Sequence, residues 1–279
     1  MMSARQQAWT SDSPETPLLG GDVTVGVVRS GDTVRRPPGI SSPAVRVLLE
    51  HLEETGFDGA PRYLGVDDRG RDVLSFIEGE TAGRPAPEWV ADTDRAISVA
   101  RLLRRYHDAV ASLGVPTVFD GARLSEPQGL PPALEVHRDL IGHRDITVEN
   151  VVFREGAAVG LIDFDLARAS SRADDICNML QWWAPWMPAE DRPGPLIDVD
   201  PYQRTRAMLD AYSLDPAERR LLVPLARNGA ERSWHLMRHR ALVDGGGWRR
   251  MWDEGVGDAI LRRQEWLRRN ERSLIESVS

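Results

Sequence analysis

Residues 143–150 read His143-Arg144-Asp145-Ile146-Thr147-Val148-Glu149-Asn150, and residues 162–165 read Ile162-Asp163-Phe164-Asp165. A loop of the form H-R-D-x-x-x-x-N places a carboxylate, here Asp145, where it can accept a proton from a hydroxyl. The amide of Asn150 is then placed to bind a metal ion, and Asp163 supplies a second, charged ligand. The residues between the two motifs predict a hairpin of two short strands, at 151–153 and 159–162, interrupted by Glu155-Gly156.

A second H-R-D occurs just upstream, at His137-Arg138-Asp139. Five residues after Asp139 stands Arg144, a cation that cannot bind magnesium, whereas five residues after Asp145 stands Asn150. Only the second copy therefore has the spacing that this chemistry needs.

The sequence before the motif predicts a small antiparallel sheet with one helix. Alternation at Val23, Val25 and Val27, a turn at 30–32 and a strand at 33–36 predict a hairpin, which Pro37-Pro38 ends. Apolar residues at helical spacing predict a helix that begins at Ser42-Pro43 and ends before Gly56. Two more strands are expected near 62–66 and 72–77. The rest of the chain is expected to be mainly helical, with helices near 96–110, 202–212, from Asp215 onward and near 257–275.

Composition narrows the chemistry. All 35 basic residues among the 279 are arginine, so mechanisms that need a Schiff-base lysine or a P-loop lysine are excluded. The net charge of -8 argues against nucleic acid as a partner, because such proteins need a basic face. A cationic small molecule is a better match than nucleic acid for this net negative charge.

Cysteine use and hydropathy point to an ordinary soluble protein. Cys177 is the only cysteine, which excludes a disulfide framework and favours a small core residue over a nucleophile. No stretch approaches the ~20 apolar residues of a membrane span. We therefore expect no membrane partner and a cytoplasmic location.

Taken together, these features resemble the aminoglycoside phosphotransferase and choline-kinase-like family, which has a protein-kinase-like fold. The resemblance extends from Gly20 to the pair Asp174-Asp175 and beyond, and covers almost the whole chain. It implies an α+β, bilobal fold with a small β-rich N-lobe containing one helix and a larger, mainly helical C-lobe. The expected division is a disordered tail at 1–17, an N-terminal nucleotide-binding lobe at 18–78 and a C-terminal catalytic and acceptor-binding lobe at 79–279.

The resemblance also implies roles for the catalytic loop. Asp145 would be the catalytic base, with His143 and Arg144 completing the catalytic loop. Asp175 would be the buried carboxylate that braces the loop's backbone. An aspartate favoured at a helix N-terminus by the helix dipole explains Asp175 nearly as well, and both roles can hold together.

The expected cofactors are ATP or GTP and Mg²⁺. Asn150 and Asp163 would hold the magnesium ions, and Asp165 would be a further ligand or part of a turn. Gly20 and Gly21 would lie near the phosphates. The segment 75–79, with Ser75, Phe76 and Ile77, would be the hinge whose backbone meets the purine.

Two departures from the family pattern concern the phosphate-binding cation. The usual lysine is replaced by Arg35, with Arg36 on the other face of the strand, and arginine can grip phosphates through a bidentate fork. One or both could instead be solvated edge charges. The glutamate that usually pairs with the lysine would fall near Ala44, and the nearest carboxylate is Glu50, so this ion pair is missing or rebuilt.

Candidates for the acceptor pocket are aromatic and acidic residues of the C-terminal part, although tryptophans at such spacing are more often core. They are Trp182, Trp183, Trp186, Asp191, Asp198, Asp200, Glu231, Trp234 and His235.

By this resemblance, the chain would transfer the γ-phosphate of ATP or GTP to a hydroxyl of a small molecule, such as an aminoglycoside-like antibiotic, an amino alcohol or a sugar. The alternative is a catalytically impaired pseudokinase that acts as a nucleotide-binding regulatory module. A protein kinase is disfavoured, because no Ala-Pro-Glu-type segment follows Asp163.

Overall fold

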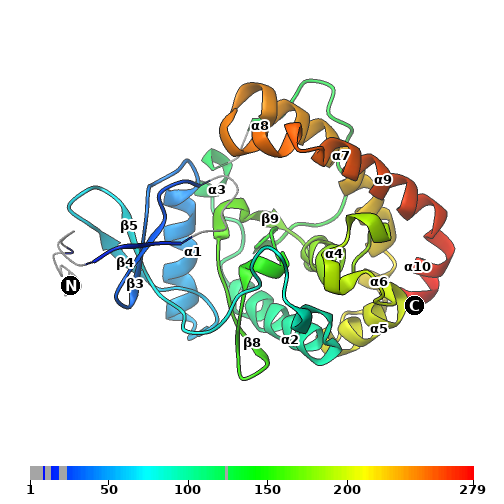
Figure 1. The fold of residues 1–279 in the computed structure, drawn as a ribbon, viewed down its shortest axis with the longest axis horizontal. Helices are drawn as coiled ribbons and strands as arrows, with labels where there is room; N and C mark the ends of the chain where they lie inside the picture. Colours follow the sequence, from blue (N-terminus) through cyan, green and yellow to red (C-terminus); the bar gives the residue numbers. More distant parts are fainter. Residues whose placement is uncertain (1–8, 10–13, 19–23, 123–124) are drawn as a thin grey trace.

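The computed structural model describes residue 9 and residues 14–18, 24–122 and 125–279. A β-sheet with one helix forms one end of the molecule, and helices form most of the other (Figure 1). The expected α+β, bilobal fold is therefore confirmed. Gly20 and Gly21 lie outside the described residues.

The N-terminal sheet has five strands in the order β1 (Thr16–Pro17), β2 (Val28–Ser30), β3 (Thr33–Arg36), β5 (Asp72–Ser75) and β4 (Tyr63–Val66). Every neighbouring pair is antiparallel. The turn at Gly31, with φ of 60°, joins β2 to β3. This arrangement places the β3 arginines in the middle of the sheet.

Two expectations for the N-terminal part can be compared with the described residues. Val23, where a strand is expected to begin, lies outside the described residues; β2 begins at Val28, after Gly26, which adopts a left-handed conformation with φ of 88°. The described residues of the expected tail contact the sheet. Thr16 of β1 pairs with Arg29 of β2, and the indole nitrogen of Trp9 donates to the Leu64 carbonyl at 3.1 Å.

The expected helix is α1 (Ser42–Glu54), and its apolar stripe packs toward the sheet and α2. Leu48, Leu49 and Leu52 on this stripe are at most 1% exposed. Arg46 of the same helix donates to the buried Asp72 of β5 at 2.9 Å. This ion pair shows which face of the sheet α1 covers.

The chain passes between the two parts through residues 76–80. Glu80 and Phe153 exchange two backbone hydrogen bonds of 2.8 Å, so the connection is tied to the hairpin of the helical part. Gly79 has φ of 152°, and a Cβ there would lie 2.4 Å from the Phe153 carbonyl oxygen. Only glycine fits at this close approach.

The C-terminal part is built on helices α2 (Thr93–Val110), α4 (Arg172–Trp183), α5 (Pro201–Tyr212) and α7 (Leu222–Val243). Two small antiparallel pairs of strands flank the two sequence motifs: β6 (Leu140–Gly142) with β9 (Arg168–Ser170), and β7 (Val151–Arg154) with β8 (Ala157–Leu161). The other elements are α3 (Val118–Gly121), α6 (Pro216–Arg219), α8 (Gly246–Asp253), α9 (Val256–Arg269), α10 (Glu271–Val278) and short 3-10 turns at η1 (Glu88–Ala91), η2 (Val148–Asn150), η3 (Phe164–Leu166), η4 (Ala189–Asp191) and η5 (Gly194–Leu196).

The predicted helices near 96–110 and 202–212 correspond to α2 and α5. The single helix expected near 257–275 is instead two helices, α9 and α10, separated at Asn270. Asp215 caps α6 by accepting a hydrogen bond from the Ala217 amide at 2.7 Å. The long α7 then crosses α4 and runs against α9 (Figure 1).

Cys177 lies on α4 and donates its thiol to the Leu222 carbonyl at 3.1 Å. Burial raises the pKa of this thiol well above its usual value, which fits the core role expected from the sequence. Among the helices of the described residues, none is both long and apolar enough to cross a membrane.

Candidate active site

The loop after β6 is held by one buried carboxylate. Asp175, in the first turn of α4, is 0% exposed and accepts hydrogen bonds from the backbone amides of His143 at 2.7 Å and Arg144 at 2.9 Å. It also contacts His107 Nε2 at 3.1 Å. Burial alone would raise the pKa of Asp175, but the hydrogen bond and charge of His107 and the charge of Arg144 lower it to about 2. Asp175 therefore lies in the first turn of a helix and also accepts hydrogen bonds from the loop backbone, so the two alternatives considered from the sequence occur together.

Asp145 and Asn150 face each other across this loop. Asn150 Nδ2 donates to Asp145 Oδ2 at 2.9 Å and to the Asp145 carbonyl at 3.0 Å. The loop backbone is also anchored by Asn178, whose Oδ1 accepts from the Ile146 amide at 2.5 Å. Burial and the charge of Asp163 raise the pKa of Asp145 to about 7. A carboxylate with this pKa can accept a proton near neutral pH.

His143 supports the loop from its buried side. Its Nε2 donates to the Ile162 carbonyl at 3.0 Å, and its Nδ1 accepts from the Asp145 amide at 3.3 Å. Burial lowers the pKa of His143 to about 4, so the ring is neutral at pH 7. The Phe164 ring packs against it with centroids 4.5 Å apart. His143 therefore contacts the loop backbone from its buried side as a neutral ring.

Asp163 and Asp165 come from the turn after β8. Asp163 adopts a left-handed conformation with φ of 62°, which aims its side chain toward the first strands of the sheet. Its side chain is 41% exposed, although protein surrounds it closely enough that burial and Asp165 raise its pKa. Asp165 accepts hydrogen bonds of 3.1 Å from Thr24 Oγ1 and from Ser41 Oγ.

Arg36 is the cation that meets these carboxylates. It forms an ion pair with Asp165 through Nη2, and its Nη1 lies 3.7 Å from Asp163 Oδ1. Its side chain is 12% exposed. The N-terminal sheet and the C-terminal part are thus linked by ion pairs at Asp163 and Asp165, the predicted metal ligands.

Arg35 lies on the opposite face of β3. It is 4% exposed, and its guanidinium carbon lies 4.8 Å from the centre of the Trp9 ring. The structure does not bring Arg35 to the other predicted site residues. The side of β3 that faces these residues is the side that carries Arg36, not the side that carries Arg35. Alternate side chains of a strand point to opposite faces, so Arg36 takes the position expected for Arg35.

The sequence predicts that the ion pair with a glutamate of the following helix is missing or rebuilt, and Glu50 is exposed. The partner of the strand's cation comes instead from Asp165. The pair is thus rebuilt with a carboxylate from the other end of the molecule.

The expected hinge leaves β5 at Ser75. The Phe76 amide donates to the Asp32 carbonyl at 2.8 Å, and the Glu78 carbonyl accepts from Arg154 Nη2 at 2.8 Å. The side chain of Ile77 packs over Gly160, where an added Cβ would lie 2.8 Å from Ile77 Cδ1. Ile77 thus lies between Phe76 and Glu78, whose backbone amide and carbonyl, respectively, already form hydrogen bonds within the protein.

The tryptophans considered for an acceptor pocket are mostly core. Trp183 and Trp186 are at most 1% exposed, and Trp186 donates to Thr205 Oγ1 at 2.8 Å. Asp191 pairs with Arg262, and Asp200 caps α5. Trp234 is only partly buried and packs against Trp252 of α8, with ring centres 5.8 Å apart.

Several residues that matter to the site carry no motif. His107 contacts both Asp175 and the Tyr212 hydroxyl, the latter at 2.7 Å, and Asn178 stands one turn beyond Asp174. The upstream H-R-D lies elsewhere: Arg138 donates to Asp174 at 3.0 Å, and Asp139 is exposed.

The oxygen ligands present fit magnesium. Asn150 directs Nδ2 at Asp145, which leaves its amide oxygen for another partner. Within the part of the chain that the structure describes, no group of three or more His, Cys, Asp or Glu side chains could hold a metal alone. Magnesium at phosphate sites usually takes one or two carboxylates and completes its shell with phosphates and water, which suits this arrangement.

Comparison with known proteins agrees with the geometry. A sequence model described as "Phosphotransferase enzyme family" matches residues 119–222, which include both motifs. The trifolitoxin immunity protein of Rhizobium leguminosarum bv. trifolii is 36% identical over 227 residues, 74% of this chain and 76% of that protein.

Solved structures share the fold at low identity. A choline/ethanolamine kinase family protein from Mesorhizobium loti has a TM-score of 0.61 at 17% identity, covering 96% of this chain and 92% of its own. Amicoumacin kinase hAmiN, in complex with AMP-PNP, Ca²⁺ and Ami, has a TM-score of 0.63 at 12% identity, covering 94% and 90%. The GDP complex of aminoglycoside 2'-phosphotransferase-IIIa has a TM-score of 0.52 at 15% identity, covering 95% and 92%. The chain belongs to the phosphotransferase enzyme family and is a kinase-like phosphotransferase.

Proposed function

We propose that this protein transfers the γ-phosphoryl group of ATP or GTP to a hydroxyl of a small molecule, with Asp145 as the base. The observation that carries this proposal is the Asp145–Asn150 pair on a loop braced by Asp175. The raised pKa of Asp145, about 7, suits proton transfer from a hydroxyl at neutral pH.

In the proposed step, the acceptor oxygen attacks the γ-phosphorus while its proton passes to an Asp145 carboxylate oxygen. The new oxygen–phosphorus bond forms as the bond from the γ-phosphorus to the bridging oxygen breaks. The electron pair of that bond leaves with the nucleoside diphosphate. Because the transition state is loose, positioning and charge neutralisation dominate the rate.

Asn150 and Asp163 would hold magnesium, and Asp165 is close enough to join them. Magnesium at such sites neutralises the charge of the phosphates. The exposed part of Asp163 and the unengaged amide oxygen of Asn150 support this assignment.

Arg36 is proposed as the phosphate-binding cation in place of Arg35. It lies on the face of β3 that meets Asp163 and Asp165, and its planar fork suits phosphate oxygens. The backbone of Ile77 is proposed to meet the purine, because the neighbouring Phe76 amide and Glu78 carbonyl already have protein partners.

The acceptor is proposed to be an antibiotic or toxin, or a related small molecule. The name of the 36% identical relative, an immunity protein, supports a protective role. Transfer of labelled γ-phosphate to a panel of aminoglycosides, cyclic peptide antibiotics, amino alcohols and sugars tests this. Magnesium-dependent labelling of one class is expected, and nucleotide consumption that no member stimulates would contradict it.

The nucleotide-binding pseudokinase remains the second candidate, and one observation favours it. Arg36 occupies both carboxylates that would bind magnesium. An enzyme must release this contact when Mg-nucleotide binds, whereas a regulatory module can keep it. Thermal stabilisation by nucleotide that is equal with and without magnesium, and unchanged in Asp163→Asn, would favour the module.

A further inference from the structure

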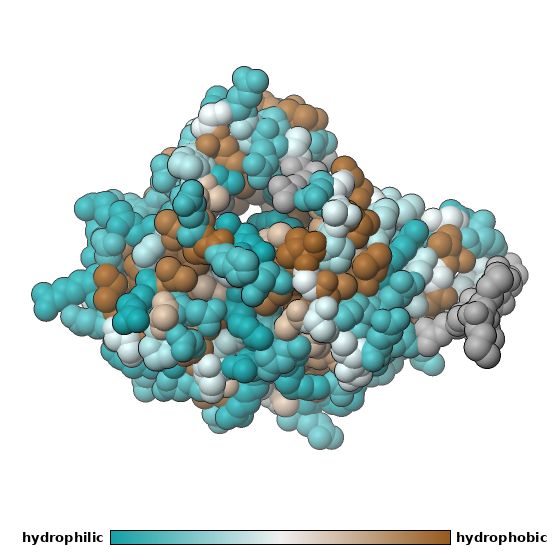
Figure 2. All heavy atoms as spheres, turned by 180° about the vertical axis from the view of Figure 1, so that it is seen from behind, coloured by the Kyte–Doolittle hydropathy of each residue, from teal (hydrophilic) through white to brown (hydrophobic). Residues whose placement is uncertain are grey.

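Three arginines gather beside the catalytic loop. Arg144 belongs to the loop itself, and Arg168 begins β9, where its Cα pairs with Gly142 directly before the loop. Arg240 lies in the last turn of α7 and places its guanidinium carbon 4.8 Å from the centre of the Trp248 ring of α8. The surface is hollowed near the middle of the molecule, below the projecting part that includes α8 (Figure 2).

These guanidinium groups have few anionic partners of their own. Among the described residues, Arg144 Nη1 and Arg240 Nε are buried without a hydrogen-bond partner. Arg144 Nη1 lies 3.7 Å from Asp174 Oδ1, and Arg168 Nη1 donates at 3.2 Å to a neutral acceptor, the Leu166 carbonyl. Buried donors without partners are costly, so such groups favour an added acceptor.

The charges also repel one another. Burial, followed by the charges of Arg144 and Arg240, lowers the pKa of Arg168 to about 9. Arg168 nevertheless remains exposed to water. A side chain that is solvent-accessible yet closely surrounded by protein is expected inside an open hollow.

The carboxylates nearest these arginines already have other partners. Asp175 is committed to the loop amides and His107, and Asp174 also accepts from Arg138 and Ser171. The charges of Asp244 and Glu126 act on Arg240, but its Nε stays without a partner. Among the described residues, Arg168 thus donates only to a backbone carbonyl, Arg240 keeps one buried donor without a partner, and the charge of Arg168 acts on Asp145.

Resting on the proposed function, we propose that the acceptor carries an oxyanion, a carboxylate or phosphate, beside its reacting hydroxyl, and that Arg168 and Arg240 bind this group. Guanidinium groups bind such anions through paired, charge-assisted hydrogen bonds. Because Arg168 pairs with Gly142, directly before the catalytic loop, an anion bound by Arg168 would lie beside this loop. This inference reverses the cationic acceptor that the overall charge of -8 favours.

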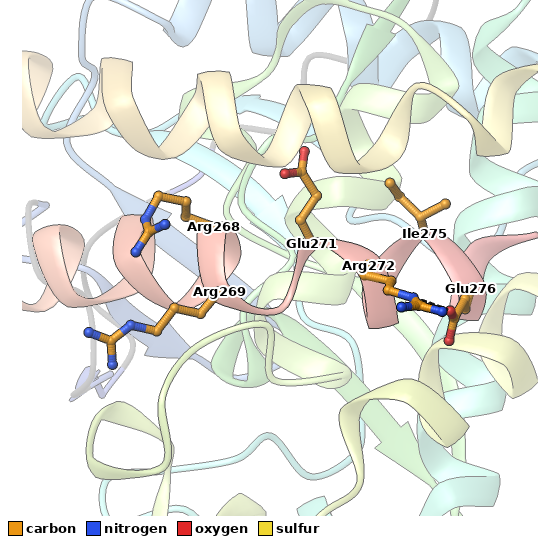
Figure 3. Close-up of a pocket in the computed structure, with 6 residues that line it drawn as sticks. All are labelled: Arg268, Arg269, Glu271, Arg272, Ile275 and Glu276. Atoms are coloured by element: carbon orange, nitrogen blue, oxygen red, sulfur yellow. Dashed lines mark hydrogen bonds and ion pairs between the residues drawn. The ribbon is translucent and has the colours of Figure 1, made fainter.

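A second group of arginines provides a matched control. Arg268, Arg269 and Arg272 border a shallow depression on α9 and α10 (Figure 3). Each is paired with a carboxylate of its own helix; Arg272 Nε, for example, lies 3.0 Å from Glu276 Oε1. Arg272 therefore lacks the unpartnered donors that distinguish Arg240.

The test is calorimetric titration of the full chain with inorganic phosphate. Arg168→Gln and Arg240→Gln should each weaken phosphate binding by roughly 10-fold or more, the loss expected for one charge-assisted contact. Arg168→Lys should restore part of the affinity, and Arg272→Gln should leave it unchanged. Displacement of phosphate by a small hydroxy acid or by glycerol phosphate then distinguishes a carboxylate from a phosphate acceptor.

The Arg36→Gln variant separates this subsite from the proposed nucleotide site. Phosphate binding that is lost in Arg36→Gln but unchanged in Arg168→Gln and Arg240→Gln would overturn the inference. Binding that depends on Arg168 and Arg240 supports the subsite even if no panel member is phosphorylated. Phosphorylation of only cationic acceptors, with the same KM in Arg168→Gln, would overturn the subsite and leave the proposed function standing.

Discussion

Asp175→Asn is the substitution that most directly tests how the catalytic loop is held. The two side chains have nearly the same shape, but the amide offers only one acceptor oxygen to the amides of His143 and Arg144. One backbone donor is then left facing an NH₂ group in a fully buried site. Loss of one charge-assisted hydrogen bond and the cost of the unpaired donor together give a destabilisation of about 3 kcal/mol.

The pKa of Asp175 gives a second, independent value for the contribution of this side chain to the free energy of unfolding. Its folded value of about 2 lies below the ordinary 3.8, so ionised Asp175 stabilises the fold above about pH 4. This contribution, about 2 kcal/mol, is lost as pH falls from about 4 to 2. The difference in unfolding free energy between wild type and Asp175→Asn should therefore shrink by that amount over this range.

The assay is urea unfolding followed by tryptophan fluorescence at pH 7 and near pH 2. Asp253→Asn is the control, because Asp253 pairs with Arg249 on the same helix and both side chains are 57% exposed. Removing such a pair costs roughly 0.3–0.5 kcal/mol. A difference for Asp175→Asn that is below 1 kcal/mol, or that stays the same at both pH values, would refute the reasoning.

Three further predictions concern other parts of the chain. Arg36→Gln should weaken ATP or GTP binding roughly 10- to 100-fold in a titration, since one charged contact contributes about 1.5–3 kcal/mol. Arg35→Gln should change nucleotide binding little. A larger loss in Arg35→Gln than in Arg36→Gln would instead support Arg35 as the phosphate-binding cation. Trp186→Ala should lower the free energy of unfolding by about 3–5 kcal/mol in urea, because the ring is buried and bonded to Thr205, and a loss below 1 kcal/mol would place it outside the core. Cys177 should react with a thiol reagent only after denaturant is added, because burial raises its pKa; fast labelling of the native protein would contradict its core position.

That the residues of the candidate catalytic loop come together could be predicted from the sequence, because they are close together in the chain. Asp145 and Asn150 come within hydrogen-bond distance, and Asp163 stands at the turn after the predicted hairpin. The left-handed backbone of Asp163 leaves no trace in the sequence, since only a folded turn imposes it.

The side of β3 that faces the site could have been inferred. Val34 packs against the core with α1, and Arg36 shares its face because side chains alternate along a strand. The expectation of Arg35 relied on a motif register and not on this alternation. The burial of Arg35 depends on Trp9, which lies in a segment expected to be a tail.

The acceptor side was the hardest to predict. Trp183 and Trp186 are buried in the core, which agrees with the alternative that tryptophans at such spacing are more often core residues. The cluster of Arg144, Arg168 and Arg240 arises from three separate elements that meet only in the folded chain. Contacts of this kind depend on how α7 crosses α4, which no local pattern encodes.

The most direct test of the account is transfer of labelled γ-phosphate to the acceptor by Asp145→Asn, compared with Asp139→Asn. The second substitution changes the exposed aspartate of the upstream H-R-D, so it controls for the loss of one carboxylate outside the candidate site. Loss of a general base is expected to lower the transfer rate by roughly 10²–10⁴-fold, with nucleotide affinity retained, whereas Asp139→Asn should transfer at the wild-type rate. Transfer by Asp145→Asn at the wild-type rate would contradict the assignment of Asp145 as the base.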